Sequence, residues 1–190
     1  VDNPPSPPLI FLLYPEERDF FMKVFGLAGW SGSGKTTLLS KLLPEFIGRG
    51  VSVSTIKHTH HSVEVDKPGK DSYIHRESGA TEVLVGSLQR WALIHEDRDE
   101  KETSLDNLIA RMAPVDLLLV EGFKAYPHDK VEVYRQDNGK PLICTEDPHI
   151  VALASDVAPP EVELPLFALD DVAGLASFIL RHCGLDGKES

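Results

Sequence analysis

Cysteine is scarce in this sequence. Only Cys144 and Cys183 occur among 190 residues, and neither lies in a CxxC pair or at the spacing of metal ligands. Isolated cysteines of this kind are expected to be reduced thiols, as in cytoplasmic proteins. We therefore expect a cytoplasmic protein without a cysteine-ligated metal site.

Clustered basic charge is also missing. The 19 lysines and arginines are scattered and are outnumbered by 30 acidic residues, which gives a net charge of −11. Nucleic-acid binding depends on patches of Lys and Arg that contact phosphates. A polybasic membrane anchor likewise needs a run of basic residues. We therefore expect neither nucleic acid nor membrane among the partners, and the acidity is best explained by solubility.

Long apolar runs are absent, even from the unusual first 21 residues. Residues 1–8 are rich in proline, and the apolar run over 9–14 is only six residues long, too short to span a bilayer. No basic segment precedes it, so a signal peptide is not indicated. Met22 follows, and a strand pattern begins at once. We interpret 1–21 as an extension that need not be native, 22–184 as one nucleotide-binding domain, and 185–190 as a tail.

Strand and helix patterns alternate from Met22 onward. Strands are predicted over 23–28, 51–56, 81–86, 90–95, 115–120, 131–134 and 150–155, and helices over 35–47, 71–78, 105–112 and 172–179. Pro44 should kink or split the first helix. Alternation of this kind predicts an α/β fold of three layers, a largely parallel sheet with helices on both faces. The strand pair 81–95 forms a short ribbon, which either stands apart or extends the main sheet.

The segment from Gly29 to Thr36 fits the phosphate-loop pattern G-x-x-x-x-G-K-[ST] without exception. Its glycines let backbone N–H groups point at phosphate oxygens, and the following helix adds its positive dipole end. Lys35 is expected to reach the β- and γ-phosphates and the Thr36 hydroxyl to ligate Mg²⁺. The predicted nucleotide-binding residues in and beside this loop are Gly29, Ser31, Gly32, Ser33, Gly34, Lys35, Thr36 and Thr37. Trp30 and Ser31 occupy variable positions of the motif, to which no individual role is assigned.

A phosphate loop also needs an acidic residue at the end of a neighbouring strand to hold Mg²⁺. Glu121 follows the apolar run 115–120 and precedes a glycine, so we predict that it is catalytic and a metal ligand together with Thr36. The alternative is a solvated carboxylate at a strand end. Asp116 begins the same strand and is rejected because it would lie at the opposite edge of the sheet.

Several short motifs extend the pattern and carry a resemblance. They are Thr55-Ile56-Lys57-His58, Asp71-Ser72 with Arg76 and Gly79-Ala80, Val120-Glu121-Gly122-Phe123-Lys124, and Asp147-Pro148 with Ala154-Ser155-Asp156. With the phosphate loop, they make residues 22 to about 183 resemble the MobB family of molybdopterin-guanine dinucleotide biosynthesis adaptors. The resemblance implies a homodimer that binds GTP, to which the phosphate-loop motif adds Mg²⁺. It also implies an adaptor that assists the guanylyltransferase joining GMP to molybdopterin, and at most slow GTP hydrolysis.

Further residues have both a functional and a structural interpretation. Lys57 and His58 are expected at the carboxyl edge of the sheet, where either could face phosphate or the pterin partner, and Lys57 is predicted to bind nucleotide. The adjacent His60 and His61 have poor geometry for a metal. Asp71 is predicted to be catalytic within a switch-like segment, or else only to cap a helix through Arg76. Asp156 ends a strand where a carboxylate can accept from guanine N1–H and N2–H. It is equally consistent with a surface loop.

Two other functions share the phosphate loop. A small-molecule kinase usually carries a lid with several arginines, and the segment 67–76 offers only one. The histidine cluster would fit a metallochaperone-type GTPase, but the absence of a CxxC motif or paired cysteines from this sequence counts against that function. The preferred hypothesis is therefore the GTP-binding adaptor.

Overall fold

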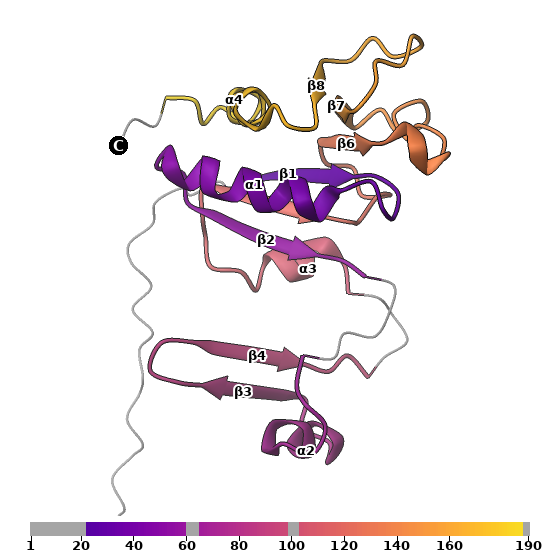
Figure 1. Cartoon of the computed structure of the whole chain (residues 1–190). Coiled ribbons are helices and arrows are strands. Elements are labelled where there is room, and N and C mark those ends of the chain that lie inside the picture. Colours follow the sequence, from indigo (N-terminus) through magenta and orange to yellow (C-terminus); the bar gives the residue numbers. More distant parts are fainter. Residues whose placement is uncertain (1–21, 60–64, 99–102, 188–190) are drawn as a thin grey trace, which may run out of the picture.

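The computed structural model describes residues 22–59, 65–98 and 103–187. Its main sheet has six parallel strands in the order β2-β5-β1-β6-β7-β8 (Figure 1). The strands are β1 (Lys23–Ala28), β2 (Val53–Lys57), β5 (Leu117–Glu121), β6 (Lys130–Tyr134), β7 (Ile150–Ser155) and β8 (Leu166–Ala168). The expected parallel α/β fold is confirmed. Among the described residues, no helix is long and apolar enough to cross a bilayer.

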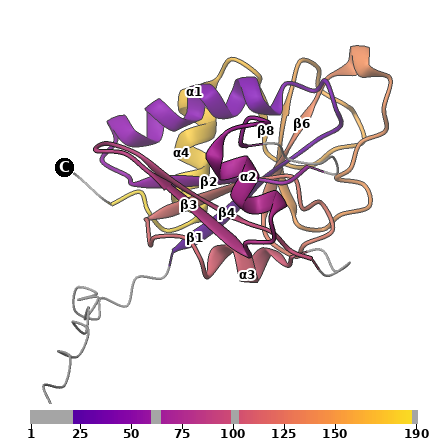
Figure 2. The same ribbon diagram turned by 90° about the horizontal axis from the view of Figure 1, so that it is seen from below.

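Helices cover both faces of the sheet, as Figure 2 shows. Helices α1 (Lys35–Gly48) and α4 (Val172–His182) lie on one face and α3 (Leu105–Ile109) on the other. The central strand β5 is buried along its whole length. Its side chains alternate, so that Leu117 and Leu119 pack under α1 and α4, whereas Leu118 and Val120 pack against Leu105 of α3.

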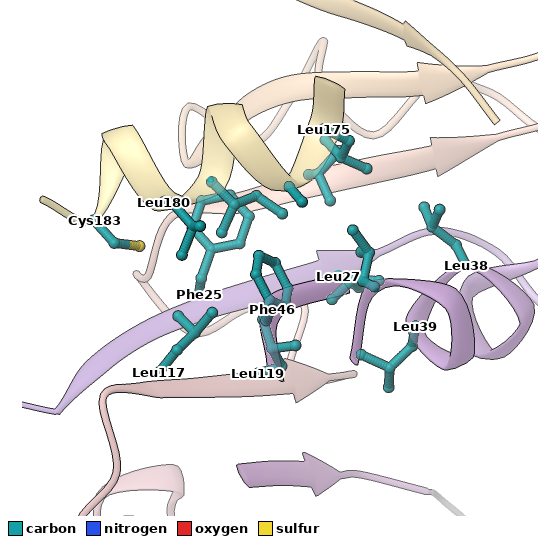
Figure 3. Packing of buried hydrophobic residues seen from close by; sticks show 14 of the residues in the cluster. Phe25, Leu27, Leu38, Leu39, Phe46, Leu117, Leu119, Leu175, Leu180 and Cys183 are labelled. Carbon is teal, nitrogen blue, oxygen red and sulfur yellow. The ribbon is translucent and has the colours of Figure 1, made fainter. Parts of the chain in front are cut away.

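The larger core lies between the sheet and the α1–α4 layer (Figure 3). Phe25 and Leu27 of β1 meet Phe46 of α1 there, and Leu175 of α4 closes the cluster. Pro44 does not split α1, which runs as one helix from Lys35 to Gly48. Pro44 is exposed, and buried residues of α1 on either side of it keep the helix on the sheet.

The ribbon of β3 (Glu82–Gly86) and β4 (Trp91–His95) forms a separate antiparallel sheet. The alternative that it extends the main sheet is therefore wrong. The short helix α2 (Asp71–Glu77) lies beside this ribbon (Figures 1 and 2). Arg76 of α2 pairs with Asp66 and with Glu96, which follows β4. Arg76 is therefore a structural ion-pair partner that joins α2 to the end of the ribbon.

Several predicted boundaries change. β5 begins at Leu117 and includes Glu121 as its last residue, because residue 116 turns away to bind the chain before β2. α3 is one short helix with the Ser104 hydroxyl as its cap. The three-residue edge strand β8 was not predicted. At the carboxyl end, Cys183 and Leu185 both pack into the main core.

Candidate nucleotide-binding site

The phosphate loop connects the end of β1 to the start of α1 (Figure 1). Gly29, Gly32 and Gly34 all have positive φ angles, of 146°, 83° and 98°. A Cβ atom on Gly29 would lie 2.5 Å from the carbonyl oxygen of Val133. The loop therefore requires glycine both for its backbone conformation and for the close approach of β6. No side chain caps α1 at Gly34, so the first N–H groups of the helix remain available to an anion.

The ammonium group of Lys35 lies over this loop. Its Nζ donates hydrogen bonds of 3.0 Å to the carbonyl oxygens of Gly29 and Trp30. Burial lowers the pKa of Lys35, and the nearby charges of Lys124 and Lys57 lower it further. The carboxylate of Glu121 opposes that shift. An anion bound against this ammonium would replace the water it has lost and restore the charged form.

Thr36 and Glu121 lie together, as predicted. The Thr36 hydroxyl donates to Glu121, with Oγ1 lying 3.1 Å from Oε1 and 3.4 Å from Oε2. Strand pairing of Glu121 with Leu27 brings the carboxylate to the edge where the loop begins. These oxygen ligands fit Mg²⁺, which retains several water ligands and needs few protein oxygens. Among the described residues, no cluster of three or more His, Cys, Asp or Glu side chains could hold a metal by itself.

Asp116 lies at the other end of β5, as predicted. Its Oδ2 accepts from the Ser52 backbone N–H at 2.9 Å and from the Ser52 hydroxyl at 2.8 Å. It thereby ties the start of β5 to the segment that leads into β2.

A cavity of about 700 Å³ opens beside Lys35 and Glu121. Its lining comprises Gly29, Ser31, Lys35, His58, Thr59, Thr103, Ser104, Leu105, Glu121, Gly122, Phe123, Lys124, Ala125 and Tyr126. We call it the first cavity. Phe123 has a positive φ of 47°, and its ring lies 4.3 Å from that of His58, measured between centroids. Local sequence patterns indicate no individual role for Phe123 or Tyr126, because the position of their side chains in the cavity wall depends on this turn.

Trp30, to which no role was assigned, bridges two loops. Its Nε1 donates a 2.8 Å hydrogen bond to the carbonyl oxygen of Pro141. The ammonium of Lys124 lies 4.2 Å from the ring centroid, close enough for a cation–π interaction. The phosphate loop is thus attached to both the 122–126 segment and the loop at 141.

A second cavity of about 370 Å³ lies beside the start of α1. It is lined by Gly34, Thr37, Leu38, Lys41, Arg135, Ser155, Asp156, Ala168, Leu169 and Asp170. Asp156 follows β7 and accepts from the Gln136 backbone N–H at 3.1 Å. Arg135, which the sequence did not indicate, donates from Nε to the carbonyl oxygen of Ser33 at 3.1 Å. Three predicted residues, Gly34, Thr37 and Asp156, therefore line one cavity, whereas Lys35 and Glu121 line the other.

Other predicted residues lie outside both linings. Lys57 ends β2, paired with Glu121 at the same edge of the sheet, but its exposed side chain does not line a cavity. Asp71 is exposed in the first turn of α2, beside the ribbon. The cap position of α2 is Lys70, so Asp71 does not cap that helix. His60 and His61 are outside the described residues.

Comparison with known proteins gives a consistent answer. The protein-family model for MobB, molybdopterin guanine dinucleotide synthesis protein B, matches residues 24–156. A "Molybdopterin-guanine dinucleotide biosynthesis adapter protein" of Escherichia coli (strain K12) is 47% identical over 161 residues, covering 83% of this chain and 91% of the relative. A protein of the same description in Haemophilus influenzae is 42% identical over 158 residues, covering 82% of this chain and 86% of that relative. A crystal structure of molybdopterin-guanine biosynthesis protein B superposes with a TM-score of 0.67 at 27% identity, over 84% of this chain and 99% of that one.

The fold, the phosphate loop beside Glu121 and these matches agree, and the chain belongs to the MobB family.

Proposed function

We propose that this protein is a GTP-binding adaptor in molybdopterin-guanine dinucleotide biosynthesis. It would assist the guanylyltransferase that attaches GMP to molybdopterin. The observation that carries the proposal is the phosphate loop, with Lys35 and Thr36 next to Glu121, in a chain of the MobB family. A small-molecule kinase and a metallochaperone-type GTPase are not favoured by the relatives.

The two cavities suggest how a nucleotide would lie. Lys35 and Glu121 belong to the first cavity, which supports a position for the γ-phosphate and Mg²⁺ there. Thr37 and Asp156 belong to the second, which supports a position for the base there. The Asp156 carboxylate already accepts from the Gln136 N–H, and its Oδ2 lies 3.9 Å from Nη1 of Arg135. Its remaining acceptor sites would take the N1–H and N2–H of guanine, a donor pair that adenine does not offer.

Hydrolysis by this protein alone is proposed to be slow and Mg²⁺-dependent. No Arg or Gln occurs among the residues that line the first cavity, and such residues orient water or neutralise the γ-phosphate in fast GTPases. We expect a turnover below about one per second without a partner. We also expect Glu121→Ala to reduce the Mg²⁺ dependence of nucleotide binding.

The discriminating experiment is competition of unlabelled GTP and ATP for a fluorescent GTP analogue. GTP should compete more strongly than ATP in the wild type. Asp156→Asn keeps one acceptor for the Gln136 N–H but loses the second acceptor for guanine. It should weaken GTP roughly ten- to a hundredfold and leave ATP unchanged. Asp137→Asn, an exposed neighbour outside the cavity, is the matched control. Equal competition by ATP and GTP would refute the base assignment and Asp156 together.

Homodimerisation and docking on the guanylyltransferase are further parts of the proposal. The ribbon carries exposed apolar side chains at Leu84, Leu88, Trp91 and Leu93. A two-stranded sheet is only marginally stable unless it packs against another part of a protein. A two-fold dimer would cover the exposed ribbon of both copies at once. Co-purification with the guanylyltransferase should weaken in Trp91→Glu or Leu93→Glu. If it does not, the partner surface lies elsewhere, for example at the carboxyl edge around Lys57 and Lys124.

A further inference from the structure

The first cavity is larger than a terminal phosphate requires. With a triphosphate oriented from Thr37 towards Lys35, only the Lys35–Glu121 end of this cavity is occupied. The remaining wall is formed by His58, Thr59, residues 103–105 and residues 122–126. A cavity of about 700 Å³ is within the range of sites for complete small molecules, roughly 300–1,000 Å³.

One wall of this remaining space is aromatic and is held by an unusual backbone. Gly122 and Phe123 have consecutive positive φ angles of 102° and 47°. A Cβ on Gly122 would lie 2.8 Å from the Cβ of His58, so the turn is packed directly against the end of β2. Positive φ is uncommon for a bulky residue and concentrates at functional sites. Here it places the Phe123 ring on that of His58, at the cavity wall.

Tyr126 adds a second ring to the lining. A hydrogen bond to Asp106 of α3 raises the pKa of its hydroxyl, with a further contribution from burial. The hydroxyl end of the ring therefore lies near α3. The wall presents two aromatic side chains, which suit a flat aromatic ligand because ring pairs stack or meet edge to face.

The same cavity carries cationic groups. Lys35 lies at the nucleotide end, and Lys124 also lines the cavity, with its ammonium over the ring of Trp30. Thr59, Thr103 and Ser104 also line the cavity and carry hydroxyl groups. Among the described residues of the lining, Glu121 is the acidic one, and its carboxylate is already bonded to Thr36. An anionic substituent on the ligand would therefore meet Lys124.

We propose that the first cavity binds a second ligand beside the triphosphate, a flat aromatic heterocycle that bears an anionic group. The ring packs on Phe123 and Tyr126, and the anion pairs with Lys124. This inference adds a second ligand site beside the nucleotide site. It rests on the proposed function for the orientation of the triphosphate. The protein would then hold two small molecules next to each other at one edge of its sheet.

The test uses the full chain and the fluorescent probe pterin-6-carboxylate, titrated with and without saturating Mg²⁺ and a non-hydrolysable GTP analogue. Binding should persist when the analogue is bound. Unsubstituted pterin, which lacks the carboxylate, and glycerol 3-phosphate, which lacks the ring, should each bind at least fivefold more weakly. Phe123→Leu should weaken the probe at least fivefold by removing the ring, and Lys124→Gln should do so by removing the charge. Lys70→Gln, which alters an exposed lysine at the start of α2, should change nothing.

The possible failures are distinguishable. Loss of probe binding in the presence of the GTP analogue would show that the probe occupies the phosphate loop, and would overturn a separate second site. Normal GTP binding with no probe binding would also overturn it, while leaving the nucleotide proposal intact. Probe binding that is equally strong in Phe123→Leu and Lys124→Gln would place the ligand outside this cavity. Probe binding without any GTP binding would instead refute the proposed function.

Discussion

Lys35 is the residue on which triphosphate binding should depend most. Its ammonium is held over the loop by two carbonyl oxygens and is partly desolvated. Replacing it with alanine removes a charge–phosphate contact and should weaken GTP binding by about 2–5 kcal/mol. Calorimetric titration measures this, and circular dichroism should remain unchanged because the side chain is not part of the core. Lys70→Ala is the control, and equal affinity of Lys35→Ala and wild type would remove the nucleotide site.

The buried ring of His128 should lower the free energy of unfolding of the protein in acid. Its ring is 8% exposed, and both of its nitrogens lack hydrogen-bond partners. Burial is the main reason that its pKa falls from 6.5 to about 4, and the charge of Lys130 adds to the effect. Below pH 6.5, His128 therefore binds a proton in the unfolded chain, whereas in the folded protein it stays neutral until the pH falls to about 4. Between these values folding should lose about 1–3 kcal/mol, the partial exposure reducing the full effect.

His128→Leu tests this account. The leucine keeps apolar packing against Gly26 and Tyr126 but cannot titrate. Urea unfolding at pH 8 and pH 5 should show that the variant loses less stability between these pH values than the wild type. His75→Leu, which changes an exposed histidine of α2, serves as the control. Identical pH dependence of His128→Leu and wild type would show that other groups cause the acid sensitivity.

At the residue scale, site residues can be predicted from the sequence where a short motif or a strand end specifies their position. Lys35, Thr36 and Glu121 were found because a motif and a strand end specify them. Phe123 and Arg135 were missed because their roles arise from a positive φ and from contact with a loop about a hundred residues away. Asp71 is a residue for which the sequence suggested a role at the nucleotide site, but which lies in another part of the structure. A carboxylate next to a mixed-charge segment suggested a switch, but the structure places it in the first turn of α2 beside the ribbon.

Helix α1 contains the clearest conflict at the element scale. Pro44 lies inside it, so the Ser40 carbonyl has no N–H donor four residues on. Pro44→Ala should restore this bond and increase the free energy of unfolding by about 1–3 kcal/mol, a gain reduced by the greater freedom of the unfolded chain. Urea unfolding measures the change. Pro160→Ala, outside any helix, should give no gain, and a destabilised Pro44→Ala would mean that the proline fits its helix.

Element boundaries were predictable to different degrees. Strands β1 and β7 match their predicted ranges at both ends, because buried parallel strands are continuous apolar runs bounded by polar or glycine residues. Strand β8 was missed because three residues, two of them exposed, carry no periodicity. The ribbon was predicted, but its independence from the main sheet depends on long-range pairing that no local pattern records.

At the scale of the whole molecule, parallel strand order explains where function gathers. The carboxyl ends of β1, β2, β5 and β7 meet at one edge, which bears the phosphate loop, Glu121 and Asp156. Ligands of open α/β sheets bind at such an edge. Both cavities lie there, on either side of Lys35 and Thr37. The ribbon is a separate sheet, which leaves it available for another task.

That separation predicts that assembly and nucleotide binding can be uncoupled. Trp91 is 69% exposed and Leu84 64%, so the ribbon displays large apolar side chains that a second copy would cover. Trp91→Glu places a charge in that contact and should convert a dimer into a monomer at micromolar concentration, measured by sedimentation. GTP affinity should stay within about twofold, because surface changes distant from a site rarely alter it. Gln89→Glu adds the same charge at the ribbon's turn and should leave the dimer intact. A wild-type monomer would refute the dimer. Loss of GTP binding in a folded Trp91→Glu variant would mean instead that the nucleotide site is completed by the second copy.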